Sequence, residues 1–203
     1  MKFGDLIYVQ KNSLDRDFCN KLIEKFNSHS SKSKGVVGAG YRPETKQSID
    51  LNITNVNGFD EEDSVISDVL SKALLNYHRY AKTVMNDAYG FGSVEDSGFQ
   101  IQRTEPNGFY SWHHDALTRL KSADENSVTI QKRIITYIWY LNDVKENGYT
   151  EFIDGTRIQP EAGTLVLFPA EEVYVHRGYP PKSEVKYLMT GWVWVEKSFD
   201  LNE

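Results

Sequence analysis

The heptapeptide YSWHHDA, residues 110–116, brings together two histidines and an aspartate, side chains that bind metal ions. Because side chains alternate across a strand, His113 and Asp115 are predicted to lie on one face and His114 on the other. Residues two positions apart on one face stand about 7 Å apart at the backbone. An imidazole nitrogen and a carboxylate oxygen can therefore reach one ion at about 2.1 Å each.

A metal site needs a third ligand, and His176 is the only histidine that follows this pair in the sequence. Two histidines and one carboxylate on one side of a divalent ion leave coordination positions open for substrate and oxygen, as in non-haem Fe(II) oxygenases. Two other interpretations stay open at this point. A His-x-Asp pair also forms a purely local hydrogen bond at many strand ends, and the same three ligands with zinc would suit a metal hydrolase.

The second half of the chain has the sequence pattern of a sheet. From Phe99 onward, short runs rich in β-branched and aromatic residues alternate with turn signals such as PNG at residues 106–108. The predicted strands are Phe99–Thr104, Phe109–Asp115, Arg133–Asn142, Thr150–Ile153, Thr164–Pro169, Val173–His176 and Val185–Glu196. Because no helical pattern separates them, they predict an antiparallel sandwich or jelly roll.

The first half is predicted to be helical. Apolar residues recur at helical spacing in Asp15–Ser28, with Ser13 as the expected cap, and again in Asp60–Met85. The Gly- and Ser-rich stretch Ser30–Ser48 between them is predicted to be a loop. The expected fold is therefore mostly β, a double-stranded β-helix (jelly roll) with N-terminal helices packed on one outer face. We expect one domain over residues 1–203, with a helical support region at 1–97 and a jelly-roll core at 98–197.

Composition narrows the functional classes. The chain of 203 residues has a net charge of -6 and no sizeable Lys/Arg cluster, which makes a nucleic-acid partner unlikely by charge. Cys19 is the only cysteine, so no intrachain disulfide and no multi-cysteine zinc site can form. No apolar run approaches about 18 residues, and the N-terminus carries charges where a signal peptide would be apolar. We therefore expect a cytoplasmic protein with no membrane partner; the oligomeric state stays open.

Five segments between about residues 99 and 195 resemble, in order and spacing, the catalytic domain of the 2-oxoglutarate and Fe(II)-dependent dioxygenases, in particular their prolyl 4-hydroxylase-like branch. The segments are PNGFYSWHHD, RIITYIWYLND, NGYTEF, IQPEAGTLVLFP and HRGYPPKSEVKYLMTGW. The resemblance implies that His113, Asp115 and His176 bind Fe(II). It also implies 2-oxoglutarate and O2 as cosubstrates, with ascorbate as an accessory reductant.

The resemblance also suggests residues that bind 2-oxoglutarate. Its far carboxylate needs a buried cation. Lys186 is the candidate, because it shares a predicted strand face with Leu188, Thr190 and Trp192; Arg177 and Lys182 are rival cations. Tyr140 is expected to donate a hydrogen bond to the same carboxylate. The branch commonly has a tyrosine nine or ten residues before its first iron ligand, where Thr104 and Arg103 stand in this chain. Thr104 or Gln102 is expected to take its place with a shorter reach, or water to fill the gap.

The implied reaction is hydroxylation of an unactivated C–H bond, coupled to oxidative decarboxylation of 2-oxoglutarate to succinate and CO2. A prolyl residue in a peptide or protein is the first expected substrate, with a free amino acid or small metabolite as the alternative. Tyr110, Arg119 and Lys121 are candidates to receive it. The stretch Leu117–Ser127 and the loop before Ser48 are candidate lids. A non-catalytic metal-binding jelly roll is the other alternative.

Overall fold

The computed structural model describes residues 2–124 and 127–200, without the side chains of residues 121–124, 127 and 200. It contains two antiparallel sheets and two α-helices, the jelly roll with helices on one outer face that the sequence predicts. In the part of the chain that the structure describes, no helix combines the length and the apolar character that a membrane span requires.

The larger sheet runs through nine described strands. Their order is β1 (Tyr8–Gln10), β11 (Leu165–Pro169), β8 (Ser127–Tyr140), β13 (Lys186–Asp200), β5 (Gln100–Thr104), β3 (Ile49–Asn52) and β2 (Ser33–Lys34), with β4 (Glu95–Asp96) on β13 and β7 (Thr118–Asp124) on β8. β8 and β13 form its centre, paired from Leu188 opposite Tyr140 to Asp200 opposite Ser127. These two long strands supply side chains to both faces of the sheet.

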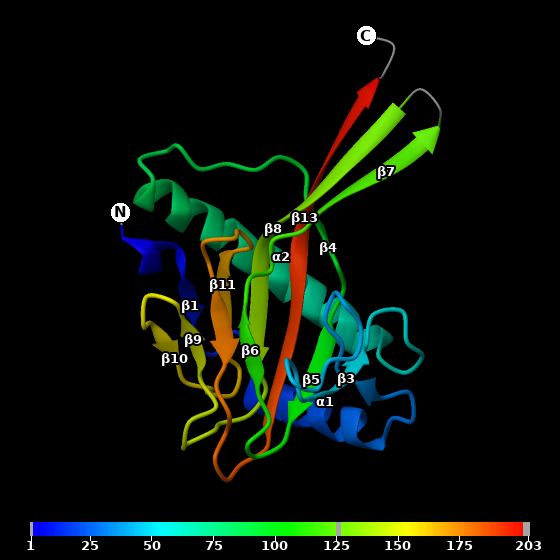
Figure 1. The fold of residues 1–203 in the computed structure, drawn as a ribbon, viewed down its shortest axis with the longest axis vertical. Helices are drawn as coiled ribbons and strands as arrows, with labels where there is room; N and C mark the ends of the chain where they lie inside the picture. The colour runs from blue at the N-terminus through cyan, green and yellow to red at the C-terminus, as the bar shows by residue number, and fades with distance from the viewer. Residues whose placement is uncertain (1, 125–126, 201–203) are drawn as a thin grey trace.

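The smaller sheet has four described strands. It follows the order β10 (Arg157–Ile158), β9 (Thr150–Phe152), β12 (His176–Gly178) and β6 (Tyr110–His113). In Figure 1, β6, β9 and β10 lie in front of the larger sheet, and α2 passes behind β8 and β13. The smaller sheet and the helices therefore cover opposite faces of the larger sheet.

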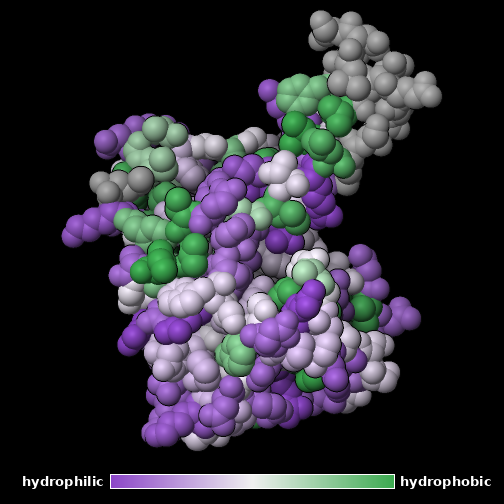
Figure 2. Space-filling view, viewed as in Figure 1, coloured by the Kyte–Doolittle hydropathy of each residue, from purple (hydrophilic) through white to green (hydrophobic). Residues whose placement is uncertain are grey.

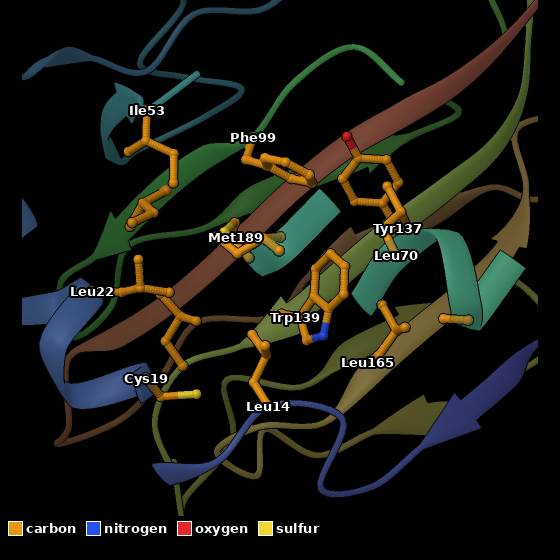
Figure 3. Close-up of a cluster of buried hydrophobic side chains, with 14 of the residues drawn as sticks. Leu14, Cys19, Leu22, Ile53, Leu70, Phe99, Tyr137, Trp139, Leu165 and Met189 are labelled. Carbon is orange, nitrogen blue, oxygen red and sulfur yellow. The ribbon is translucent and has the colours of Figure 1, made fainter. Parts of the chain in front are cut away.

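Two helices, α1 (Arg16–Ser28) and α2 (Asp60–Val84), cover one face. Their apolar sides pack on the sheet in a core that includes Leu22, Leu70, Trp139 and Met189 (Figure 3). α1 begins at a different cap from the one predicted. The Asp15 carboxylate, and not Ser13, accepts a hydrogen bond from the amide of Phe18 at 2.7 Å. Asp15 stands immediately before the helix and can reach the free amides of its first turn.

The stretch Leu117–Ser127, predicted as a loop, is mostly strand. β7 pairs with the first part of β8, and β8 begins at Ser127, six residues before its predicted start. Together with the end of β13 these strands form an arm that projects from the body (Figure 1). On the face in view, hydrophobic side chains gather over the N-terminal segment and on this arm, whereas the surface between them is mostly polar (Figure 2).

Other boundaries also differ from prediction. The strand predicted at Val173–His176 instead begins at His176, since Val173–Val175 are turn and coil in the structure. Residues 1–97 also contribute four strands, β1 to β4, that the sequence does not predict. These strands are two to four residues long, too short to show the alternation of apolar and polar residues that identifies a strand.

Candidate functional site

His113, Asp115 and His176 meet between the two sheets. His113 ends β6, His176 begins β12, and the two residues face each other directly in the register of that strand pair. The Nε2 atoms of His113 and His176 lie 3.9 and 3.7 Å from the two carboxylate oxygens of Asp115. All three ligand atoms lie within 4.8 Å of one another. The sequence predicts that these three side chains converge; in the structure two of them come from paired strands, and Asp115 lies two residues after the end of β6.

Hydrogen bonds orient each of these side chains. The carbonyl oxygen of Ser111 lies 2.8 Å from Nδ1 of His113, and that of Tyr174 lies 2.9 Å from Nδ1 of His176. A carbonyl oxygen can only accept, so both Nδ1 atoms carry the proton and both Nε2 lone pairs face the centre. Thr136 donates to Oδ2 of Asp115 at 2.8 Å.

Electrostatics keep the three groups ready to bind a cation. Burial, with a contribution from His176, lowers the pKa of His113 to about 4, so its imidazole is neutral near pH 7. Burial alone would raise the pKa of Asp115, but the two imidazoles and the Thr136 hydroxyl lower it below its usual value. Two imidazole nitrogens and one carboxylate form a ligand set that suits divalent iron. Atoms that share an ion at about 2.1 Å stand roughly 3 to 4 Å apart, so the observed spacing fits this group.

A cavity of about 430 Å³ extends from the three residues, and Lys186 lines it. The Lys186 side chain is 3% exposed, and the described residues give its ammonium one acceptor, the carbonyl of Gly148 at 3.0 Å. Burial lowers its pKa to about 8. A buried ammonium that has no carboxylate beside it among the described residues fits the far carboxylate of 2-oxoglutarate, which would supply the opposite charge. Leu188, Thr190 and Trp192 line the same cavity, as the predicted strand face requires.

The sequence suggests two other residues for 2-oxoglutarate binding, and of these Thr104 lines the cavity whereas Tyr140 does not. Thr104 is buried, lines the cavity and stands opposite Lys186 in the register of β5 and β13. Tyr140 is not among the lining residues. Its hydroxyl donates to Oγ1 of Thr150 at 2.7 Å, and Thr150 does line the cavity. Thr150 therefore stands between Tyr140 and the cavity.

Tyr110 lies closer to the metal ligands than strand alternation predicts. Its ring stacks on the imidazole of His113, with ring centres 3.6 Å apart and planes at 15°. Alternation would put Tyr110 on the opposite face, but a bulge shifts the register. His113 and Tyr110 are three residues apart in β6, whereas the residues that they pair with in β12, His176 and Gly178, are two residues apart. A bulge of this kind turns a side chain to the other face, and a single sequence gives no signal for it.

Of the two remaining substrate candidates, the structure places only the side chain of Arg119. Arg119 is not among the residues that line the cavity; its guanidinium stands 4.0 Å from the ring centre of Trp194, at the base of the arm. The side chain of Lys121 lies outside the described part of the structure. Their roles in substrate binding stay predictions.

The cavity is also lined by two cations that the sequence does not predict as site residues, Arg133 and Lys46. The guanidinium of Arg133 stacks on Trp192 at 3.6 Å and donates to the Asp115 carbonyl at 3.3 Å, while its Nε has no partner among the described residues. Lys46 comes from the predicted loop before Ser48. Arg133 is the first residue of the motif segment RIITYIWYLND, three residues before Thr136, so the motif is the sequence feature that could have pointed to it as a site residue. Lys46 has no such feature.

Comparisons with known proteins agree with this geometry. Residues 99–194 match the sequence model described as the 2OG-Fe(II) oxygenase superfamily. Among curated proteins, none matches the sequence. The solved structures with a similar fold include a viral collagen prolyl hydroxylase from Paramecium Bursaria Chlorella virus-1 in complex with 2OG. It is 21% identical, has a TM-score of 0.66, and the match covers 95% of this chain and 97% of the viral one.

Two further solved structures share the fold. A prolyl-4-hydroxylase from Pseudomonas putida is 17% identical with a TM-score of 0.60, and 92% of this chain matches 91% of it. A prolyl hydroxylase from Trichoplax adhaerens, in complex with a hypoxia inducible factor peptide fragment, is 14% identical with a TM-score of 0.66. That match covers 93% of this chain and 83% of the other. At these identities the likeness shows the fold.

Proposed function

Residues 99–194 belong to the 2OG-Fe(II) oxygenase superfamily, which makes the chain an Fe(II)- and 2-oxoglutarate-dependent dioxygenase, and from this premise we propose that it hydroxylates a prolyl residue in a peptide or protein. The reaction would convert 2-oxoglutarate, O2 and the prolyl residue to succinate, CO2 and a hydroxyprolyl residue, with one oxygen atom of O2 in succinate and the other in the new hydroxyl group. The observation that carries the proposal is the convergence of His113, Asp115 and His176 at a cavity that also contains the buried Lys186.

In this proposal the three converging residues hold iron, which supplies the oxidising chemistry when it is bound. The backbone carbonyls of Ser111 and Tyr174 keep the two imidazoles turned toward the ion, and Thr136 keeps the carboxylate in place. Orienting partners of this kind typically change metal affinity or activity by about 10- to 100-fold. The chain therefore provides an already oriented ligand set.

We assign 2-oxoglutarate to the part of the cavity beside Lys186. Its ammonium would pair with the far carboxylate, and Thr104 and Thr150 both line the cavity with hydroxyl groups that can donate to it. Tyr140 would contribute through Thr150 in the geometry observed. A shift of the Thr150 side chain on ligand binding would open the direct contact that the sequence predicts.

We assign the substrate to the other part of the cavity, bounded by Tyr110, Arg133 and Trp192. The guanidinium of Arg133 has five N–H groups, of which one donates to the Asp115 carbonyl, so others can donate to a substrate carbonyl oxygen; stacking on Trp192 fixes the plane of the guanidinium. Peptide bonds supply such carbonyls. The Trichoplax structure is described with a bound peptide fragment and the viral protein as a collagen prolyl hydroxylase, which supports a peptide over a small metabolite.

Succinate formation tests the proposed function. We expect the protein, with Fe(II), ascorbate and 2-oxoglutarate, to form succinate slowly without substrate and faster with a peptide that contains proline. His113→Ala is expected to abolish both rates. The matched control is His78→Ala, which changes a half-buried histidine of α2 that packs against Phe91. Folded, iron-loaded protein that forms no succinate would instead favour a non-catalytic metal-binding protein.

The location of the protein is a separate proposal. Cys19 is a buried free thiol, which suits the reducing cytoplasm that we propose as its compartment.

A further inference from the structure

A second cavity, of about 450 Å³, adjoins the catalytic one. Residues of the segment 34–49 form one side of it, and residues 103–108, at the end of β5 and in the turn that follows, form the other. Lys46 and Ser48 line both cavities. The two spaces therefore share a wall.

This wall contains a buried donor. Lys46 is 5% exposed, its ammonium lies 2.7 Å from Oδ2 of Asp50, and Ser48 donates to the other carboxylate oxygen at 2.7 Å. An ammonium has three N–H groups, and among the described residues its hydrogen-bonding acceptor is Asp50. N–H groups remain for an oxygen placed between the cavities. Because Asp50 already neutralises the charge, a neutral amide carbonyl suits this position better than a carboxylate.

The wall also stands close to the metal ligands. Lys46 lies 5.4 Å from the ring centre of Tyr110, the ring that stacks on His113. Backbone hydrogen bonds join the wall to the segment around β6, from the amide of Ser111 to the carbonyl of Thr45 and from the amide of Gln47 to that of Phe109, each at 2.8 Å. An extended chain advances about 3.3 Å per residue, so a few residues of polypeptide suffice to reach from one cavity into the other.

The second cavity has the chemistry of a side-chain subsite. Tyr41, Pro43 and Pro106 give it apolar surface, and Tyr41 is 50% exposed. Its charged lining residues are Lys34, Lys46, Arg103 and Glu105; because Asp50 neutralises Lys46 and Glu105 neutralises Arg103, Lys34 supplies the excess positive charge. Lys34 stands 5.0 Å over the Tyr41 ring, and Arg103 pairs with Glu105. The subsite therefore favours an apolar or acidic side chain and disfavours a basic one.

We propose that the second cavity binds residues of a polypeptide substrate that flank the hydroxylated residue, with Lys46 donating a hydrogen bond to a substrate carbonyl between the two cavities. This inference rests on the proposed function and makes it more specific. The substrate is a polypeptide of several residues, and an apolar or acidic residue lies close to the hydroxylated one. A free amino acid would occupy the catalytic cavity alone.

Substrate length tests the proposal. The probes are an acetylated, amidated Ala-Pro-Ala tripeptide and a nonapeptide with central proline and only alanine and glycine around it. We expect the nonapeptide to have a kcat/KM at least about tenfold higher, equivalent to about 1.4 kcal/mol. Tyr41→Ala should bring this ratio close to one. Leu75→Ala, an exposed apolar residue of α2 outside both cavities, should leave the ratio unchanged.

Flanking charge gives a second measurement. Nonapeptides with glutamate beside the central proline should be preferred over those with lysine, and Lys34→Glu, at an exposed position, should reverse that preference. Equal kcat/KM values for the two lengths, or a length advantage that survives Tyr41→Ala, would overturn the inference and leave prolyl hydroxylation standing. Succinate formation that no peptide accelerates would overturn the inference and the peptide substrate, but not the oxygenase. Absence of all succinate formation would overturn the proposed function as well.

Discussion

The two faces of the larger sheet are made by alternate residues of the same two strands, yet they differ in chemistry. On the helix side, Trp139 of β8 and Met189 of β13 are fully buried in an apolar core. On the side of the smaller sheet, Thr136 of β8 and Lys186 and Thr190 of β13 are also buried, but they line a cavity with polar groups. Because burying polar groups costs free energy, the first face should provide stability and the second function.

The largest expected effect is on the polar face. Asp115→Ala removes a metal ligand, so we expect uncoupled succinate formation to fall by more than the roughly 100-fold that loss of an orienting partner costs. The unfolding free energy of the metal-free protein should change by no more than about 1 kcal/mol, because a costly buried carboxylate is lost together with its hydrogen bond to Thr136. Succinate assays and urea unfolding measure the two effects. Asp68→Ala, at an exposed position on α2, is the control.

A substitution on the apolar face should instead lower stability and leave activity almost unchanged. Trp139→Ala empties a large volume between the helices and the sheet and removes the hydrogen bond from Nε1 to Ser13, 3.1 Å long. Loss of a buried tryptophan typically costs about 3–5 kcal/mol of stability. We expect a loss of this size in urea unfolding, with succinate formation per folded molecule within about threefold of the original. Lost activity at unchanged stability would show that the two faces are not separate.

Lys186→Met tests a buried charge on the polar face. The 2-oxoglutarate KM at pH 7 should rise, reflecting about 2 kcal/mol or more of lost binding free energy, because the far carboxylate would be left without a partner. In the original protein, this KM should rise with pH above about 8, as Lys186 loses its proton. The variant should lack that dependence. A KM equally dependent on pH in both proteins would assign the carboxylate to another group.

The same lysine gives a stability effect of defined sign. Its folded pKa of about 8 lies below the ordinary 10.5, so between these pH values the unfolded chain binds more protons than the folded one. The contribution of Lys186 to the stability of the ligand-free protein therefore rises with pH over this range. Lys186→Met should be more stable than the original at pH 7, with a smaller difference near pH 10. A difference that grew with pH would contradict the burial of this charge.

The sequence predicts the long, regular parts of this architecture well. Helical periodicity predicts α1 and α2 closely, and alternation along β13 correctly separates Lys186, Leu188 and Thr190 from Met189. Prediction from the sequence fails where a strand depends on its pairing with another strand and not on its own residue pattern. β7 was predicted as loop because its polar residues show no alternation, and it becomes a strand through pairing with β8.

The candidate site also contains residues that the sequence predicts and residues whose position depends on tertiary structure. The motif spacing identifies His113, Asp115 and His176, and the structure brings them together. The position of Tyr110 depends on a bulge, and that of Lys46 on how the segment before β3 folds over β6. Both are tertiary features that leave no local pattern in one sequence, so the shared wall of the two cavities emerges only from the structure.

The smallest expected effect lies at the boundary between scaffold and site. Thr136 belongs to β8, and its hydroxyl holds Oδ2 of Asp115 at 2.8 Å. Thr136→Val keeps the shape and removes the donor, so we expect metal affinity to fall about 10-fold, at the lower end of what an orienting partner contributes. Stability should fall by about 1 kcal/mol. Thr136→Ser should restore the affinity, because it keeps the hydroxyl, and metal titration of the three proteins measures this. If the Thr136→Val protein bound metal as tightly as the original, the Thr136 hydroxyl would not be needed to orient the Asp115 carboxylate. The hydrogen bond would then contribute to stability alone.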